Sequence, residues 1–444
     1  MRLSFKFYLA SIVIGIIGGA ICVAFRYLIL LLHDIRLGLF KLGNHSDFQR
    51  ISNAITTDSP FYLLLKYLIL FVFIVIFLNI VNFIVKEYPT TTGSGLPQTK
   101  ALLEGKITYK SPFKNIIAKF IGGILSIASG LSFGREGSSV QMGSLIGYIF
   151  GRCFKVKNDD NNYLIAAGAG AGVAAAFTAP LASSILILES LRNTNTSDVK
   201  KLTTATLLSG LCAGIIASVF FPKNIYSSIS IIKPDLKELQ SLIIFMIMAL
   251  TFSILGKIFS KLFIYIKTNY EQFQTRHDKY YLMLALLICA VTFFYPSLIG
   301  GNQVFIIEII NNDGFGFFNN MIIIIILSTL SIISNATGFP GGLFIPLLSL
   351  GALLGKIFCI TLAEFDIVNL SNTGYFVLIG MSVFLISVVR TPLTGFILIS
   401  EMTGNYELLF PTLVVGILTY IFTEIMRVKG LDDILYDMMF SKNQ

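Results

Sequence analysis

Charged side chains are scarce in this sequence. Only 13% of the 444 residues are charged, whereas 55% are hydrophobic, and the mean hydropathy is +0.80. A soluble domain carries about 25% charged residues, so the composition excludes a soluble enzyme, a disordered chain and a nucleic-acid-binding module. Lys and Arg outnumber Asp and Glu by 33 to 24, and this surplus fits cationic loops on the cytoplasmic face of a membrane. The composition predicts a polytopic membrane protein.

Motifs for metal, nucleotide or nucleophilic chemistry are also missing. The sequence contains no HExxH, P-loop or GxSxG pattern, and its three histidines show no ligand spacing. No A-x-A cleavage site follows the apolar N-terminal run, which we therefore interpret as the first membrane helix. The five cysteines form no CxxC pair, and we interpret them as small buried hydrophobic residues: Cys22, Cys153, Cys212, Cys289 and Cys359. We expect no metal and no cofactor.

Runs without charge map the membrane segments, because a charge at the bilayer centre is costly. Most of these runs have the length of an ordinary span, and Pro180 interrupts one of them: 7–25, 67–85, 161–188, 202–222 and 280–307. Two regions differ. Residues 120–134 and 137–151 form two short runs of 15 residues separated by a charged pair, whereas 314–355 is a run of 42 residues cut by glycines and prolines. Both regions predict broken helices, whose irregular backbone is tolerated at membrane depth only inside protein or beside a cavity.

The two anomalous regions belong to an internal duplication. The ten residues from Pro180 and the ten from Pro392 share six identities at an offset of 212. Residues 125–129 match 330–334 at an offset of 205, and 143–147 match 351–355 at 208. Three matches in the same order predict two repeats, about 1–222 and 223–444, within one membrane domain and without an appended soluble domain. Many transporters follow this plan and bind substrate at discontinuous helices on the repeat interface.

Three glycine-rich turns could hold an anion. They are Gly93, Ser94, Gly95, Leu96 and Pro97; Gly134, Arg135, Glu136, Gly137 and Ser138; and Gly342, Leu343, Phe344, Ile345 and Pro346. The last two lead into predicted helices, whose N-termini present unpaired N–H groups and the positive end of the dipole. Glycines could instead serve only close helix packing. Three such turns, two of them at duplicated positions, favour a site that binds a small anion without a full positive charge.

In order and spacing, these turns resemble the three selectivity-filter motifs of the CLC chloride channels and transporters. The resemblance runs from about residue 7 to the C-terminus and is closest to prokaryotic members without CBS domains. It implies an all-α membrane protein with two inverted repeats of tilted and broken helices. It also implies a homodimer in which each subunit holds a complete anion pathway, with a cytosolic N-terminus.

The resemblance also assigns roles to single residues. Ser94 resembles the serine whose hydroxyl coordinates chloride, and Leu343 and Phe344 resemble the pair whose backbone N–H groups do so from the other half. Gly93 and Gly137 stand beside them as anion-binding positions. Glu136 resembles the gating glutamate: its carboxylate would compete with chloride for the same N–H donors until protonation releases it. We interpret Arg135 as a structural support and not as a ligand.

Three positions depart from the family pattern. Proton-coupled relatives often carry two adjacent acids where this chain has Glu189 and Ser190, and serine cannot shuttle a proton by ionising. The central-site tyrosine aligns with Asp432, one helical turn before Tyr436, so that either the register shifts locally or the inner gate differs. Lys100 stands where relatives often carry an acid, and we interpret it as an interfacial lysine.

The sequence therefore predicts chloride transport in a bacterial inner membrane, with Glu136 favouring exchange for protons. A passive chloride channel gated by Glu136 is the alternative, because Ser190 argues against the usual inner proton route. A fluoride-exporting relative is a further alternative, against which the intact GSGLP turn argues. A membrane-embedded enzyme using Glu136 or Glu189 would need a partner nucleophile, base or metal ligand, and none is visible.

Overall fold

A computed structural model describes residues 5–39, 60–154, 158–191, 198–222, 231–276, 280–301, 303–311 and 316–441. Within these ranges it has seventeen α-helices and no strand, and eight of the helices are long and apolar enough to cross a bilayer. The first half contains α1 (Phe5–Leu39), α3 (Pro60–Glu87), α4 (Leu96–Leu103), α5 (Pro112–Ala128), α6 (Glu136–Cys153), α7 (Asn158–Phe177), α8 (Pro180–Ser190) and α9 (Val199–Phe220). The second contains α10 (Glu238–Arg276), α11 (Tyr280–Phe294), α12 (Gln303–Asn311), α13 (Phe317–Ala336), α14 (Phe344–Glu364), α15 (Thr373–Val389), α16 (Pro392–Thr403), α17 (Leu409–Ile425) and α18 (Leu431–Ser441).

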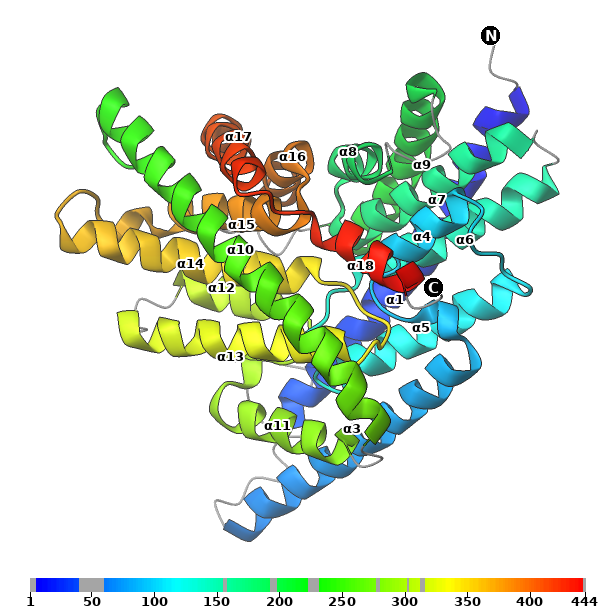
Figure 1. Cartoon of the computed structure of the whole chain (residues 1–444), viewed down its shortest axis with the longest axis horizontal. Coiled ribbons are helices and arrows are strands. Elements are labelled where there is room, and N and C mark those ends of the chain that lie inside the picture. The colour runs from blue at the N-terminus through cyan, green and yellow to red at the C-terminus, as the bar shows by residue number, and fades with distance from the viewer. Residues whose placement is uncertain are drawn as a thin grey trace.

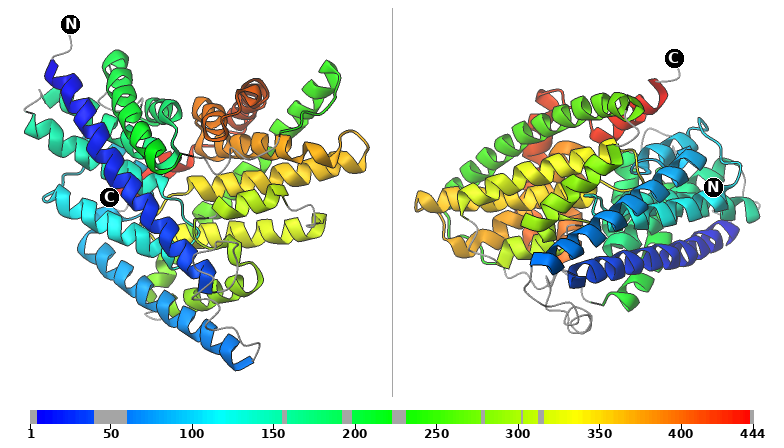
Figure 2. Two further views of the ribbon diagram at one scale, coloured as in Figure 1. Left: turned by 180° about the vertical axis from the view of Figure 1, so that it is seen from behind. Right: turned by 90° about the horizontal axis from the view of Figure 1, so that it is seen from below.

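The helices of the two halves correspond in order, with α18 added at the end. The short α4, of 8 residues, corresponds to α12, of 9, and α8, of 11 residues, corresponds to α16, of 12. In Figure 1 the first-half helices α6, α7 and α9 lie on one side and the second-half helices α14 and α15 on the other. The long α10 crosses the front of that view, and its counterpart α1 crosses the back, as Figure 2 shows.

Backbone conformation repeats at the duplicated offset. Thr178 and Arg390 lie 212 positions apart, and both adopt a left-handed conformation, with φ of 56° and 71°. Residues other than glycine seldom adopt it, and here each precedes a helix that begins with proline, α8 and α16. The duplication seen in the sequence is therefore a duplication of chain path.

The same two helices exchange carboxylates. Glu189, at the end of α8, accepts hydrogen bonds from the backbone N–H groups of Leu393 and Thr394 at the start of α16, both at 2.9 Å. Glu401, near the end of α16, accepts from Leu181 and Ala182 at the start of α8, at 3.1 and 2.8 Å. Each acid thus satisfies orphan donors at the positive end of the other helix. Reciprocal contacts of this kind are expected of two copies related by a two-fold axis.

Both anomalous regions of the sequence are broken helices, as predicted. The first break lies between the end of α5 at Ala128 and the start of α6 at Glu136, and the second between Ala336 of α13 and Phe344 of α14. The run 161–188 likewise divides into α7 and α8 before Pro180. The interpretation of 280–307 as one span is wrong. There α11 ends at Phe294, a 3₁₀ turn follows at Pro296–Leu298, and α12 begins at Gln303.

The search for uncharged runs missed the longest helix, because this helix contains charged residues. The 39-residue α10 carries lysines along its length, and two of them reach the ends of other helices. Lys257 Nζ donates to the carbonyl of Met426 after α17, and Lys267 Nζ to that of Asn335 at the end of α13, both at 3.3 Å. Terminal carbonyls have no partner within their own helix and carry the negative end of its dipole. These lysines are thereby accommodated within a membrane domain.

The cysteines are free thiols. Cys22 and Cys359 are buried, and Cys212 and Cys289 are partly buried, in line with small hydrophobic residues. Cys153 is exposed at the end of α6, so the interpretation as a buried residue is wrong for this one.

Candidate functional site

The first glycine-rich turn brings Ser94 to the start of α4. Gly93 and Gly95 flank the serine with φ of 66° and 96°, a conformation that only glycine adopts without strain. A Cβ atom on Gly95 would also collide with the carbonyl oxygen of Gly137. Glycine is therefore required at position 95 for two independent reasons, and α4 starts directly after it with Leu96 and Pro97.

The second and third turns pair with each other across the two halves. Gly134 N–H donates to the carbonyl of Gly342 at 2.8 Å, and Gly342 N–H donates back to Gly134 at 2.6 Å, as an isolated antiparallel bridge. Two residues beyond these glycines, α6 begins at Glu136 and α14 at Phe344. The bridge thus fixes two helix N-termini side by side, one from each repeat.

The first turn joins this pair. Gly93 N–H donates to the carbonyl of Gly338 at 3.0 Å, and Gly341 N–H donates to that of Gly93 at 3.3 Å. On the other side, a Cβ atom on Gly137 would collide with the Ser94 carbonyl. The three predicted turns therefore meet, and the N-termini of α4, α6 and α14 converge. Such ends offer N–H donors and positive dipole ends to an anion.

At this meeting point, a hydroxyl group has no partner. Ser94 is 7% exposed, and its Oγ atom makes no hydrogen bond with the part of the chain that the structure describes. A buried polar group without a partner is costly and calls for a ligand or water. The Ser94 hydroxyl therefore fits the role of an anion ligand.

Glu136 lies in the same place. Its side chain is 1% exposed, and neither carboxylate oxygen makes a hydrogen bond with the described residues. Its Oε2 atom occupies the space that a side chain on Gly134 would need, 2.0 Å from where a Cβ atom would be. It also lies 3.2 Å from where a Cβ atom on Gly342 would be. The backbone nitrogen of Ile345, in the first turn of α14, is 3.2 Å from that same Gly134 position. The carboxylate thus stands beside donors that an anion would need.

Arg135, Ser138, Leu343 and Phe344 are the other residues of the two paired turns considered for the site. Arg135 Nε and Nη2 both donate to the carbonyl of Ala176, at 3.0 and 2.8 Å, near the C-terminus of α7. Leu343 and Phe344 are buried at the start of α14, where side chains are apolar and only the backbone can act as a donor. Ser138 is also buried.

Sequence reasoning missed Lys119. This residue of α5 is fully buried, and its Nζ donates to the carbonyls of Thr91 and Gly93, at 2.8 and 2.7 Å. Lys119 therefore fixes the backbone segment that leads into Ser94. The sequence did mark this position, since Lys119 is the charged residue directly before the uncharged run 120–134. Nothing in the sequence says, however, that this lysine points inward.

The candidate inner residues lie around a cavity of about 530 Å³ on the side of α18. Glu189, Ser190 and Asp432 line this cavity together with Lys100, whose Nζ forms an ion pair with Asp433 at 2.8 Å. Lys100 is thus bound to α18, which the interpretation as an interfacial lysine did not foresee. The Tyr436 hydroxyl is engaged by Lys106 and Glu104, and Tyr436 is not among the residues that line the cavity.

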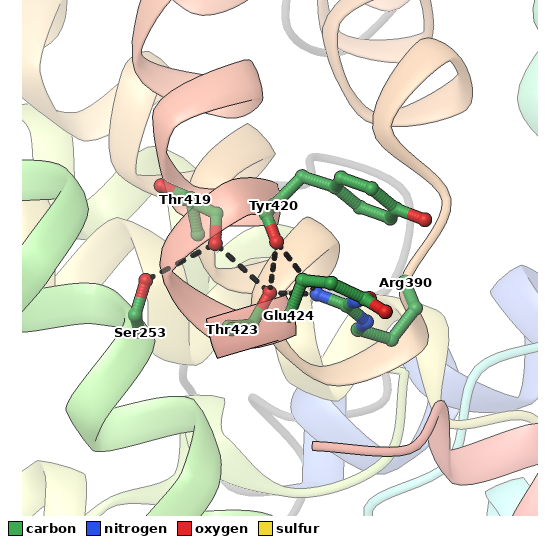
Figure 3. A network of polar contacts seen from close by, with 6 residues as sticks. All are labelled: Ser253, Arg390, Thr419, Tyr420, Thr423 and Glu424. Atoms are coloured by element: carbon green, nitrogen blue, oxygen red, sulfur yellow. Dashed lines mark hydrogen bonds and ion pairs between the residues drawn. The ribbon is translucent and has the colours of Figure 1, made fainter. Parts of the chain in front are cut away.

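Arg390 forms another wall of this cavity, but it is not an available cation. Figure 3 shows its guanidinium against the last turn of α17. There it donates to the carbonyl of Tyr420 at 2.9 Å and contacts Thr423 and Glu424. Because three groups of one helix hold it, Arg390 joins the α15–α16 connection to α17.

Comparison with known proteins agrees with this architecture. The family model described as voltage gated chloride channel matches residues 67–424. The H(+)/Cl(-) exchange transporter ClcA of Vibrio cholerae is 28% identical over 429 residues, covering 95% of this chain and 87% of that protein.

Solved structures show the same fold. A slow cyanobacterial Cl⁻/H⁺ antiporter superposes with a TM-score of 0.85 at 24% identity and covers all of both chains. A CLC-type fluoride/proton antiporter gives a TM-score of 0.76 at 20% identity, covering 96% of this chain and 98% of the other. The converging helix ends, the duplicated chain path and the extent of the family match lead to one conclusion: this multi-pass membrane protein belongs to the voltage gated chloride channel (CLC) family.

Proposed function

We propose that this chain exchanges chloride for protons across a bacterial inner membrane, with Glu136 as the gate. The observation that carries the proposal is the position of the Glu136 carboxylate, between Gly134 and Gly342 and beside the N-termini of two helices. Relatives named as H(+)/Cl(-) exchange transporters support it. The exchange needs no cofactor and no enzymatic step.

Chloride would bind through neutral donors. The Ser94 hydroxyl contributes from the first half, and the backbone N–H groups of Leu343 and Phe344 from the second. Gly93 and Gly137 keep the backbone close enough for both sets to reach one ion. Because these donors carry only partial charges, binding is strong enough to replace hydration and weak enough for release.

Glu136 links the anion to the proton. While ionised, its carboxylate occupies the space beside the N–H donors and excludes chloride. A proton removes the charge, which weakens the attraction to the helix ends and frees the side chain to leave. The protonated Glu136 side chain then leaves the site and chloride binds there instead. Proton movement in one direction is thereby coupled to chloride movement in the other.

A passive chloride channel is the second candidate, and Ser190 favours it because serine cannot relay a proton by ionising. Protein reconstituted in liposomes under a chloride gradient, with a pH electrode outside, distinguishes the two. We expect chloride to drive protons uphill. Chloride flux without proton movement would overturn exchange in favour of the channel. Replacing chloride with fluoride in the same assay tests the fluoride alternative, for which we expect the smaller flux.

We also propose that two copies assemble through the face formed by α8, α9, α16 and α17, which lie together in Figure 1. Leu181 and Leu393, which are equivalent in the two repeats, are about half exposed there, and Ile215 of α9 and Phe410 of α17 are more exposed. Light scattering of the detergent-extracted protein is expected to give the mass of a dimer. A monomeric mass at all concentrations would contradict this assembly.

A further inference from the structure

The cavity beside α18 ends close to the turn that carries Ser94. Its walls include Leu96 and Pro97, which belong to the same glycine-rich turn as Ser94, and Ser190 at the end of α8. The Ser94 carbonyl in turn touches Gly137, next to Glu136. The start of α4 therefore lies between this cavity and the gate.

Five carboxylates line the cavity, and four of them have partners. Glu189 accepts hydrogen bonds from the start of α16, and Glu424 contacts Arg390. Asp433 pairs with Lys100 at 2.8 Å, and Asp437 with Lys429 at 3.7 Å. These four are committed to structural contacts.

Asp432 is the fifth and differs from the others. Within the described residues it makes neither an ion pair nor a hydrogen bond, although it is only partly exposed. Burial, together with the neighbouring Asp433 carboxylate, raises the pKa of Asp432 to about 7, while the Lys100 ammonium acts in the opposite direction. The acid is thus protonated and deprotonated by small changes around neutral pH.

The charges around Asp432 come from several elements. On its own helix are Asp433, Tyr436 and Asp437, and α4 contributes Lys100. The remaining walls contribute Glu189 of α8, Arg390 after α15, Glu424 of α17 and Lys429 before α18. Since all three cations are paired with other acids, none fixes Asp432 in its charged form.

We infer that Asp432 is the proton acceptor on the α18 side of the membrane and replaces the acid missing at position 190. This inference rests on the proposed exchange of chloride for protons. In proton-coupled relatives the second acid stands at the position of Ser190, whereas here the inference gives that proton-accepting function to Asp432. It also explains how a chain with Ser190 can carry a proton-sensitive gate.

Hydroxyl groups in the same cavity would carry the proton onward. Thr391 lines the cavity, is 4% exposed, and its Oγ1 has no hydrogen-bond partner among the described residues. Asp432 takes a proton from water on the α18 side and passes it to water held by Thr391 and Ser190. A proton reaches the Glu136 carboxylate along that water, and Asp432 is left ionised for the next cycle. No bond other than O–H forms or breaks.

The test uses the full-length protein in liposomes, with chloride and proton flux measured together. Asp432→Asn removes the titratable group, and we expect chloride flux to persist while proton flux falls by about 100-fold, as for the loss of a proton-transfer group. Asp235→Asn is the matched control, because it makes the same substitution at an exposed position that does not line the cavity. It is expected to keep the wild-type ratio of protons to chloride.

Restoring an acid in the same cavity gives an independent readout. Ser190→Glu in the Asp432→Asn background is expected to recover proton flux, which a purely structural role for Asp432 does not predict. Wild-type coupling in Asp432→Asn would overturn the inference and leave the proposed exchange standing. A wild-type protein that moves chloride but no protons would overturn both.

Discussion

The two paired filter turns have the same backbone and different side chains. Gly134 and Gly342 exchange hydrogen bonds, and a helix starts two residues after each. The first turn then presents Arg135 and Glu136, whereas the second presents Leu343 and Phe344. The symmetric backbone thus provides donors from both repeats. The carboxylate that lies beside those donors, that of Glu136, has no counterpart in the second turn, where Phe344 stands. If Glu136 is the gate, as we propose, the proton-sensitive step arises where the two repeats have diverged.

The shared backbone is the feature whose loss should matter most. In Gly137→Ala the new Cβ would collide with the Ser94 carbonyl, and overpacking of this kind costs about 1–3 kcal/mol or more. We expect a lower melting temperature in detergent and no measurable chloride flux. Gly316→Ala is the control, since nothing lies within 4 Å of a Cβ there. If Gly137→Ala transports normally, the turns do not approach each other as closely as this.

Removing the asymmetry at Glu136 should separate the two fluxes. Glu136→Gln keeps the shape of the side chain but cannot be ionised, so it imitates the protonated gate. Chloride flux is expected to remain and to lose its pH dependence, while proton flux disappears. Glu364→Gln, at the exposed end of α14, should behave like the wild type. A Glu136→Gln protein that still pumps protons would show that the gate lies elsewhere.

Position 190 tests the proposed proton path at one wall of the cavity. Ser190→Leu should block the water path and lower proton flux while chloride flux continues. Ser190→Ala should slow protons only modestly, because a hydroxyl contributes one donor and two acceptors to a water chain. Proton flux of wild-type size in Ser190→Leu would place the path outside this cavity. The comparison of Leu with Ala separates blockage from loss of the hydroxyl.

The smallest effect is expected for the loss of the Ser94 hydroxyl, because it is one of several donors to the anion. Ser94→Ala removes a hydroxyl whose hydrogen bond to the anion is worth about 0.5–1.5 kcal/mol, so chloride affinity should fall several-fold by calorimetry. Ser349→Ala is the control, because that hydroxyl already bonds to the Ile345 carbonyl within α14. Unchanged chloride affinity and unchanged halide and nitrate permeability ratios in Ser94→Ala would argue against Ser94 as a ligand.

Many features of this architecture could be predicted from short segments of the sequence. Scarce charge predicts the membrane domain. A charged pair between two runs too short to span a bilayer predicts the first helix break, and glycine and proline within one long apolar run predict the second, because a helix cannot continue through them. Repeated segments predict the duplication. The glycines of the three turns predict backbone that approaches other backbone. These signals depend on neighbours in the chain, so the sequence by itself determined them.

Contacts between distant residues could be decided only by the tertiary structure. The sequence could not show that α10 tolerates its lysines because Lys257 and Lys267 reach the carbonyl ends of other helices. It could not show that Lys119 turns inward to hold Gly93, or that Tyr436 is bound by Lys106 and Glu104. The availability of Asp432 likewise depends on which cations its neighbours have already engaged. Whether a polar side chain is structural or available follows from the partners that folding brings to it, and those partners lie up to 333 residues away in the chain.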